Sequence, residues 1–230
     1  MNQLILAMLA FVGTHFLLSH PLRAPLVAKI GDKGFQGLYS VVALGTFYWV
    51  YVAFRAAPRG ADRWMVSDVH WGVGSVLMLV GAILFAGSFV GNPAMPSPTA
   101  KADAAKPVHG VFHIARHPMM WGFGLWAVVH ALVAPYSASF VLTGGMFLLA
   151  IGGSAGQDAK KAKLMGDAWA DWSARTSFLP FARQLTGKAP LSTIWPGLTP
   201  VLGGIVIWLG ATYLHPMLGA PVVGMWRVLG

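Results

Sequence analysis

Histidine is the residue type in this chain best suited to chemistry, and four of the eight histidines lie between His109 and His130. The sequence has no cysteine, which excludes disulfides, thiolate metal sites, iron–sulfur clusters and cysteine lipidation. It also has no glutamate, and its seven aspartates all lie outside the long apolar runs. A paired-carboxylate mechanism inside a membrane is therefore excluded. Intramembrane chemistry would need histidine, tyrosine, a hydroxyl group or a bound cofactor.

Two histidines lie within apolar runs, where charged residues are absent. His15 follows LILAMLAFVGT, and His130 follows WGFGLWAVV. An imidazole in hydrocarbon is costly without a partner, so each is a candidate functional residue. The alternative is a neutral histidine hydrogen-bonded to a neighbouring helix. One helical turn before His130 lie Ala127 and Trp126, and such a mixture of small and aromatic residues suits either a flat apolar ring or close helix packing.

A second group of histidines precedes the run that contains His130. His109, His113 and His117 are spaced i, i+4, i+8 and would share one face of a helix, as metal-binding histidines can. Their position beside Arg116 and Pro118, at the membrane surface, favours an interfacial or capping role instead. Three further histidines near the ends of apolar runs are predicted to be structural or interfacial: His20, His70 and His215.

The elements that must position these residues are membrane-spanning helices. The chain is 56% hydrophobic and only 10% charged, with mean hydropathy +0.63, whereas about a quarter of an ordinary soluble domain is charged. Because a span needs about 20 apolar residues, the sequence predicts an all-α, single-domain membrane helix bundle over 1–230. The six predicted spans are 2–20, 37–57, 70–91, 118–134, 136–156 and 194–214. Pro135 should form the turn of a tight hairpin between the fourth and fifth spans.

The distribution of Lys and Arg predicts how the spans are oriented. Twelve of the 16 basic residues follow the first, third and fifth spans, which places both termini on the non-cytoplasmic side. The N-terminal run MNQLILAMLAF lacks a basic residue, so it is expected to be a retained span rather than a cleaved signal peptide. The net charge of +9 favours contact with anionic membrane lipids over nucleic acid.

Two shorter segments also predict contacts. The segment 158–175, DAKKAKLMGDAWADWSAR, places Met165, Trp169 and Trp172 on one helical face, which predicts a cytoplasmic amphipathic helix with its tryptophans at the membrane interface. The G-x-x-x-G in GGSAG (152–156) suits either packing within the chain or an oligomer contact.

Several longer motifs point to a known family. THFLLSHPLR (14–23), RHPMMWGFGLWAVVHAL (116–132) and GDAWADWSARTSFLPF (166–181) resemble the NnrU family of membrane proteins, which includes the 15-cis-zeta-carotene isomerases. The resemblance implies haem b, bound through two histidines on different spans. By local match these ligands are His15 and His130, with His117, Arg116 and Trp126 as secondary contacts or alternative ligands.

The resemblance implies two kinds of activity. One is a redox-gated cis–trans isomerisation of a carotenoid or other polyene; the other is a haem function linked to nitrite or nitric oxide reduction. The expected substrate is accordingly lipophilic or a small gas, and the expected location is a bacterial inner membrane. The catalytic residues and the electron donor stay unassigned. A histidine that the isomerases have after their second span is absent here, where Ala57 lies near the corresponding position.

Methyl transfer from S-adenosylmethionine is the alternative. RHPMMWG, a following basic segment and FLPF also resemble the isoprenylcysteine and phospholipid methyltransferases. Those enzymes have glutamates where only Asp158 is available here.

Two histidines that bind one haem iron must lie at a similar depth in the membrane. At about 1.5 Å per residue, His15 lies roughly 12 Å from Arg23 and His130 roughly 21 Å from Arg116 along their helices. Two ligands of one iron must lie at nearly the same depth, so the tertiary structure decides whether these two histidines can share it.

Overall fold

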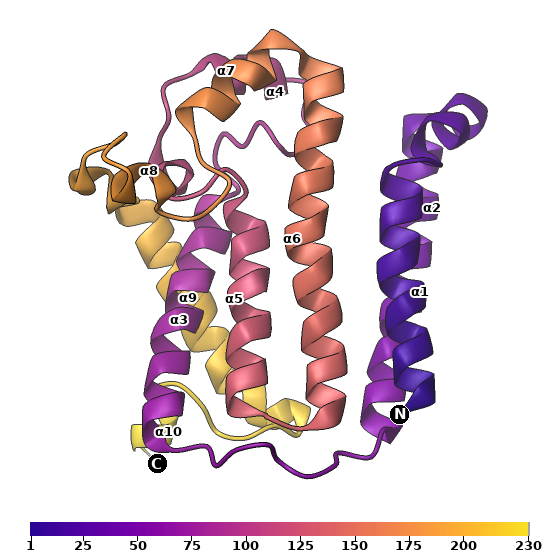
Figure 1. Ribbon diagram of the computed structural model, residues 1–230, viewed down its shortest axis with the longest axis vertical. Helices are drawn as coiled ribbons and strands as arrows, with labels where there is room; N and C mark the ends of the chain where they lie inside the picture. Colours follow the sequence, from indigo (N-terminus) through magenta and orange to yellow (C-terminus); the bar gives the residue numbers. More distant parts are fainter. Residues whose placement is uncertain (230) are drawn as a thin grey trace.

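The computed structural model describes residues 1–229, in which every regular element is a helix and there is no strand. Six long helices run up and down the bundle (Figure 1): α1 (Asn2–Ser19), α2 (Arg23–Ala56), α3 (Asp68–Gly87), α5 (Pro118–Val133), α6 (Ser137–Met165) and α9 (Leu198–Leu214). The shorter elements are α4 (Ala100–Ala105), η1 (Gly110–His113), α7 (Asp167–Arg175), α8 (Ala182–Leu185), η2 (Leu191–Ile194), η3 (His215–Leu218) and α10 (Trp226–Leu229). The predicted all-α class is confirmed.

The long helices coincide with the six predicted spans, but only five are long and apolar enough to cross a membrane. The exception is α5, whose 16 residues extend about 24 Å, against roughly 30 Å for a bilayer core. The predicted hairpin at Pro135 is present, because α5 ends at Val133 and α6 begins at Ser137. Helix α2 begins well before its predicted span, with a kink at Gly31, where φ is +71°.

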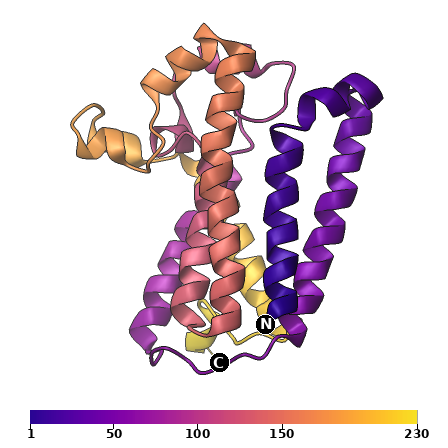
Figure 2. The same ribbon diagram turned by 45° about the vertical axis from the view of Figure 1, so that its right-hand side comes forward.

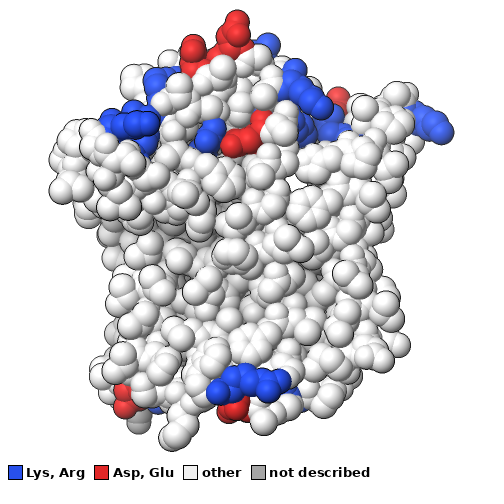
Figure 3. Space-filling view, in the orientation of Figure 1, with Lys and Arg blue, Asp and Glu red and all other residues white. Residues whose placement is uncertain are grey.

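The charged residues gather at the two ends of the bundle and leave an uncharged band between them (Figure 3). We call the end with the loops after α1, α3 and α6 the basic end. The other end carries both chain termini and is called the termini end (Figure 1). Large apolar side chains are exposed on the long helices, among them Leu9, Val41 and Val206. Exposed apolar surface of this extent is expected of a protein surrounded by lipid.

Two groups of helices make up the bundle (Figures 1 and 2). Helix α3 packs extensively against both α5 and α9, whereas α1 and α2 form a hairpin that meets the rest chiefly through α1 and α6. Glycines allow this second contact: a side chain added at Gly152 would meet the ring of Phe16, and one at Gly156 would clash with His20. The G-x-x-x-G of α6 therefore serves packing within the chain.

A cap of short elements covers the start of α5 at the basic end. Its apolar core includes Phe112 from η1, Met165 from the end of α6, and Trp169 and Trp172 from α7. The prediction of one amphipathic helix over 158–175 with tryptophans at the membrane interface is therefore wrong. The chain turns at Gly166 between α6 and α7, and the predicted apolar face packs against protein instead of lipid.

Candidate functional site

His130 lies in the last turn of α5, near the termini end. Its Nδ1 is 2.8 Å from the carbonyl oxygen of Trp126, and the two rings stack with centroids 4.2 Å apart. Because a carbonyl only accepts, Nδ1 carries the proton and Nε2 keeps its lone pair. Nε2 has no hydrogen-bond partner in residues 1–229. Metal-binding histidines are held in this way, with one nitrogen fixed by a carbonyl and the other available.

A second histidine with the same arrangement lies beside His130. His215 begins η3, directly after α9, and its Nδ1 is 2.8 Å from the carbonyl oxygen of Pro221. Its ring centroid is 6.2 Å from that of His130, with 49° between the ring planes. Within the described chain, the Nε2 of His215 is also without a hydrogen-bond partner. Two imidazoles with available Nε2 atoms thus meet at the termini end.

His15 lies in a different environment, between α1 and α2. Its Nδ1 is 2.7 Å from the carbonyl oxygen of Phe11, so Nε2 is again the free nitrogen. The ring contacts those of Phe11 and Tyr39, at centroid distances of 4.4 and 5.4 Å. The tautomer of His15 would allow its Nε2 to bind a metal. The neighbours of its ring, however, are aromatic side chains of the α1–α2 hairpin.

The structure does not bring His15 and His130 together. The residue after His15, Phe16, lies at the level of Gly152 on α6, whereas the hydroxyl of Ser139 on α6 donates to the carbonyl of His130. Gly152 and Ser139 are thirteen residues apart on α6, which is about 20 Å along the helix. Two imidazoles on one metal have their Nε2 atoms only about 4 Å apart. As a pair on one iron, His15 and His130 do not fit this structure.

Arg116 and His117 belong to a third arrangement, at the basic end. His117 precedes α5 and is buried, and its Nε2 donates to Asp158 on α6 at 2.7 Å. Arg116 lies 3.5 Å from the other carboxylate oxygen. Burial lowers the pKa of the Arg116 guanidinium, and the nearby carboxylate opposes that shift. Its Nε is buried without a partner among the described residues.

In this structure Arg116 and His117 contact Asp158 and not His130. His117 directly precedes α5, thirteen residues before His130, a separation of about 20 Å. The predicted contact of Trp126 with His130 is present. Asp158, the expected substitute for methyltransferase glutamates, is bound by Arg116 and His117.

The three histidines spaced i, i+4, i+8 do not share a helix face. His109 precedes the short η1, where its Nε2 is 3.2 Å from the carbonyl of Val90. His113 ends η1, and burial, followed by its proximity to His109, lowers the pKa of its imidazole. His117 lies beyond the end of η1. The interfacial and capping role is the one that this geometry supports.

Sequence reasoning assigned His215 to helix termination and did not predict that its ring would lie beside that of His130. One signal was available: the predicted spans that contain His130 and precede His215 both run toward the non-cytoplasmic side, so both histidines should lie near that face. The sequence did not indicate that α5 and the end of α9 are neighbours.

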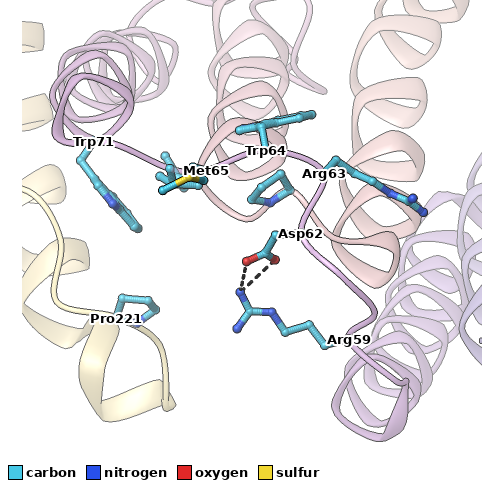
Figure 4. Close-up of a pocket in the computed structure, with 10 residues that line it drawn as sticks. Arg59, Asp62, Arg63, Trp64, Met65, Trp71 and Pro221 are labelled. Carbon is cyan, nitrogen blue, oxygen red and sulfur yellow. Dashed lines mark hydrogen bonds and ion pairs between the residues drawn. The ribbon is translucent and has the colours of Figure 1, made fainter.

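A cavity of about 590 Å³ opens at the termini end (Figure 4). Val133, three residues after His130, lines it, as does Pro221, whose carbonyl holds His215. Arg59 and Arg63 bring positive charge, and Arg59 is paired with Asp62 at 3.1 Å. The two histidines do not line the cavity themselves.

Comparison with known proteins assigns the chain to a family. The model of the NnrU family, described as NnrU protein, matches residues 3–222. The chain is 24% identical over 200 residues to the chloroplastic 15-cis-zeta-carotene isomerase of Zea mays, covering 83% of this chain and 54% of that protein. It is 25% identical over 198 residues to the isomerase of Arabidopsis thaliana, covering 82% and 53%.

The chain thus spans about half the length of the curated relatives it matches. No solved structure is significantly similar to it. The family match covers nearly every element of the bundle, from α1 to the segment after η3. This multi-helix membrane protein belongs to the NnrU family.

Proposed function

We propose that this protein is a cis–trans isomerase of a carotenoid or similar polyene, acting within the membrane with haem b bound at His130. The similarity to two 15-cis-zeta-carotene isomerases supports the reaction type. The uncharged band between the charged ends, on the face that Figure 3 shows, supports a lipophilic substrate that reaches the protein from the bilayer. The membrane is expected to be a bacterial inner membrane.

The observation that carries the proposal is the state of His130. It is a partly exposed imidazole near the end of an apolar helix, held by the Trp126 carbonyl, with Nε2 unpaired among the described residues. Because this nitrogen keeps its lone pair and is not buried, a ligand can reach it. Bound haem would supply an iron that perturbs the electrons of a polyene double bond and so lowers its rotation barrier.

The residues around His130 define what the protein itself contributes. The Trp126 carbonyl fixes the imidazole tautomer, and the stacked indole fixes the ring orientation. Cis–trans isomerisation leaves every bond of the substrate in place, so it needs no hydrolytic machinery.

Conversion of 15-cis-zeta-carotene in a bacterial host that accumulates it tests the proposal. Cells expressing the wild-type chain should convert the 15-cis isomer to the 15-trans isomer, as measured by chromatography with absorbance detection. His130→Ala should abolish the conversion, whereas His70→Ala should not, because His70 caps the start of α3 through Ser67. Equal conversion by His130→Ala and the wild type would refute the role of His130.

The alternative functions predict different results with the same purified protein. If the protein leaves the carotene unchanged but its purified haem form binds nitric oxide, the function linked to nitrite or nitric oxide reduction replaces the isomerase. If haem-free protein shows saturable binding of S-adenosylmethionine, methyl transfer replaces both.

A further inference from the structure

We propose that residues 179–195 bind the surface of the lipid bilayer at the basic end, with their apolar side chains inserted at the boundary between headgroups and acyl chains. We call these residues, which include α8 and η2, the lateral segment. Figures 1 and 2 show α8 projecting sideways from the bundle, closer to the long helices than α7 is. The proposal concerns a lipid-binding surface and does not depend on the isomerase reaction.

The lateral segment exposes large apolar side chains although it lies outside the long helices. Leu185 in α8 is 81% exposed, and Trp195, which directly follows η2, is 63% exposed. Apolar side chains gathered on a surface in this way mark a contact with a membrane or another protein. The exposed large apolar residues of the segment are Leu179, Leu185, Leu191, Ile194 and Trp195.

Hydrogen bonds hold the lateral segment at the level where α5 begins. The buried Gln184 donates from Nε2 to the carbonyl of His113 at 3.0 Å. The backbone N–H of Phe181 donates to the carbonyl of Ile114 at 2.9 Å. Both acceptors lie a few residues before Pro118, the first residue of α5. The depth of the start of α5 in the bilayer therefore sets the depth of the lateral segment.

The length of α5 places that level at the edge of the hydrocarbon. The 16 residues of α5 extend about 24 Å, against roughly 30 Å for a bilayer core. With its last residue, Val133, at the bilayer boundary of the termini end, its first residue lies roughly 6 Å inside the opposite boundary. Interfacial segments bury their apolar side chains at this depth. Lipid is therefore the partner that meets the exposed side chains of the lateral segment.

The charges of the lateral segment also fit a lipid surface. Its two charged residues are Arg183 and Lys188, and no aspartate or glutamate follows Asp171 in the chain. At the place of α8, Figure 3 shows basic atoms on the side toward the basic end and an uncharged surface toward the uncharged band. Apolar side chains below and basic ones at the headgroups are typical of segments that lie in the membrane plane. The interfacial role predicted for 158–175 is thus assigned to the lateral segment.

Spin-label accessibility in vesicles tests the proposal, and the lack of native cysteine makes each labelled position unique. Leu185→Cys in the full chain is labelled with a nitroxide and reconstituted into vesicles of phosphatidylcholine and phosphatidylglycerol. Power saturation compares collisions of the label with oxygen, which is enriched in lipid, and with a water-soluble nickel chelate. Two control variants change exposed residues: Ala170→Cys on α7, and Val41→Cys on α2 within the uncharged band.

We expect the oxygen-to-nickel collision ratio at position 185 to lie above that at position 170 and below that at position 41. Lys188→Cys, labelled in the same way, should give a lower ratio than Leu185→Cys, because position 188 faces the headgroups. A ratio at 185 equal to that at 170 would place the segment in water and overturn the proposal. Protection of the label at 185 from both reagents would mean that protein, such as a second copy of the chain, covers it, and this would overturn the proposal too. A higher ratio at 188 than at 185 would reverse the orientation and have the same consequence.

Discussion

The ion pair at the basic end gives the sharpest test of how the cap is held on the bundle. Asp158 is 24% exposed, and it binds two side chains that are more buried, His117 at 1% and Arg116 at 12%. Replacing Asp158 by Ala leaves both partners buried without their acceptor. A buried group that loses its partner costs more than the bond itself contributed, because its desolvation is no longer offset.

The expected magnitude follows from the two contacts. The 2.7 Å hydrogen bond from His117 to a charged acceptor is the stronger one, and the 3.5 Å contact with Arg116 adds less. A hydrogen bond to a charged group contributes about 1.5–3 kcal/mol; the Arg116 contact adds to this and the partial exposure of Asp158 reduces it, so we expect a loss of about 2–3 kcal/mol. For a chain of this size such a loss lowers Tm by roughly 5–10 °C.

The chain offers a matched control. Asp32 also pairs with an arginine, Arg23 at 3.2 Å, but its side chain is 69% exposed. An exposed pair contributes less than about 1 kcal/mol, so Asp32→Ala should lower Tm by only a few degrees. Asp158→Asn should lie between the two, because its amide oxygen can still accept from His117 while the charge is lost.

The assay is heating in detergent followed by size-exclusion chromatography of the remaining folded protein. If Asp158→Ala and Asp32→Ala lower Tm equally, burial does not decide the strength of these pairs and the reasoning is refuted. A large loss in Asp158→Asn, equal to that in Asp158→Ala, would show that charge rather than the hydrogen bond dominates.

Three further predictions concern packing, pH and the turn before α7. A Cβ at Gly122 would lie 2.8 Å from the carbonyl oxygen of Gly81, so Gly122→Ala should destabilise the α3–α5 contact by about 1–3 kcal/mol. Gly144 has open space around it, so the control variant Gly144→Ala should not lower Tm. Hydrogen bonds, first from Lys106, lower the pKa of Asp103, so its stabilising effect is present above the unfolded pKa of about 3.9 and is lost as the pH falls through the lower folded value. The Tm difference between wild type and Asp103→Asn should therefore shrink on acidification below about pH 4, and a difference that stays constant would contradict this assignment. Gly166 has φ +59° and ψ −130°, so Gly166→Ala should cost about 1–3 kcal/mol through backbone strain, and an unchanged Tm would show that the turn relaxes.

Composition and the length of the apolar runs determined the class of this protein. Because hydrocarbon admits only backbone that is hydrogen-bonded within the chain, long apolar runs become helices wherever they pack. The predicted runs accordingly match the long helices, and the turn at Pro135 lies where the sequence predicts it. The resemblance to the NnrU family, carried by RHPMMWG and TSFLPF, needed no structure either, and the family match bears it out.

Only the tertiary structure decided which side chains meet. The sequence identified His130 as a buried imidazole, but periodicity along one helix says nothing about the neighbouring helix or its depth. The packing of α3 against both α5 and α9 brings the ends of those helices together, which places His215 beside His130 and leaves His15 with Tyr39. In the same way, the sequence predicted the apolar face of 158–175. Whether protein or lipid covers that face depends on the turn at Gly166 and on the contact with Phe112, which comes from a distant loop.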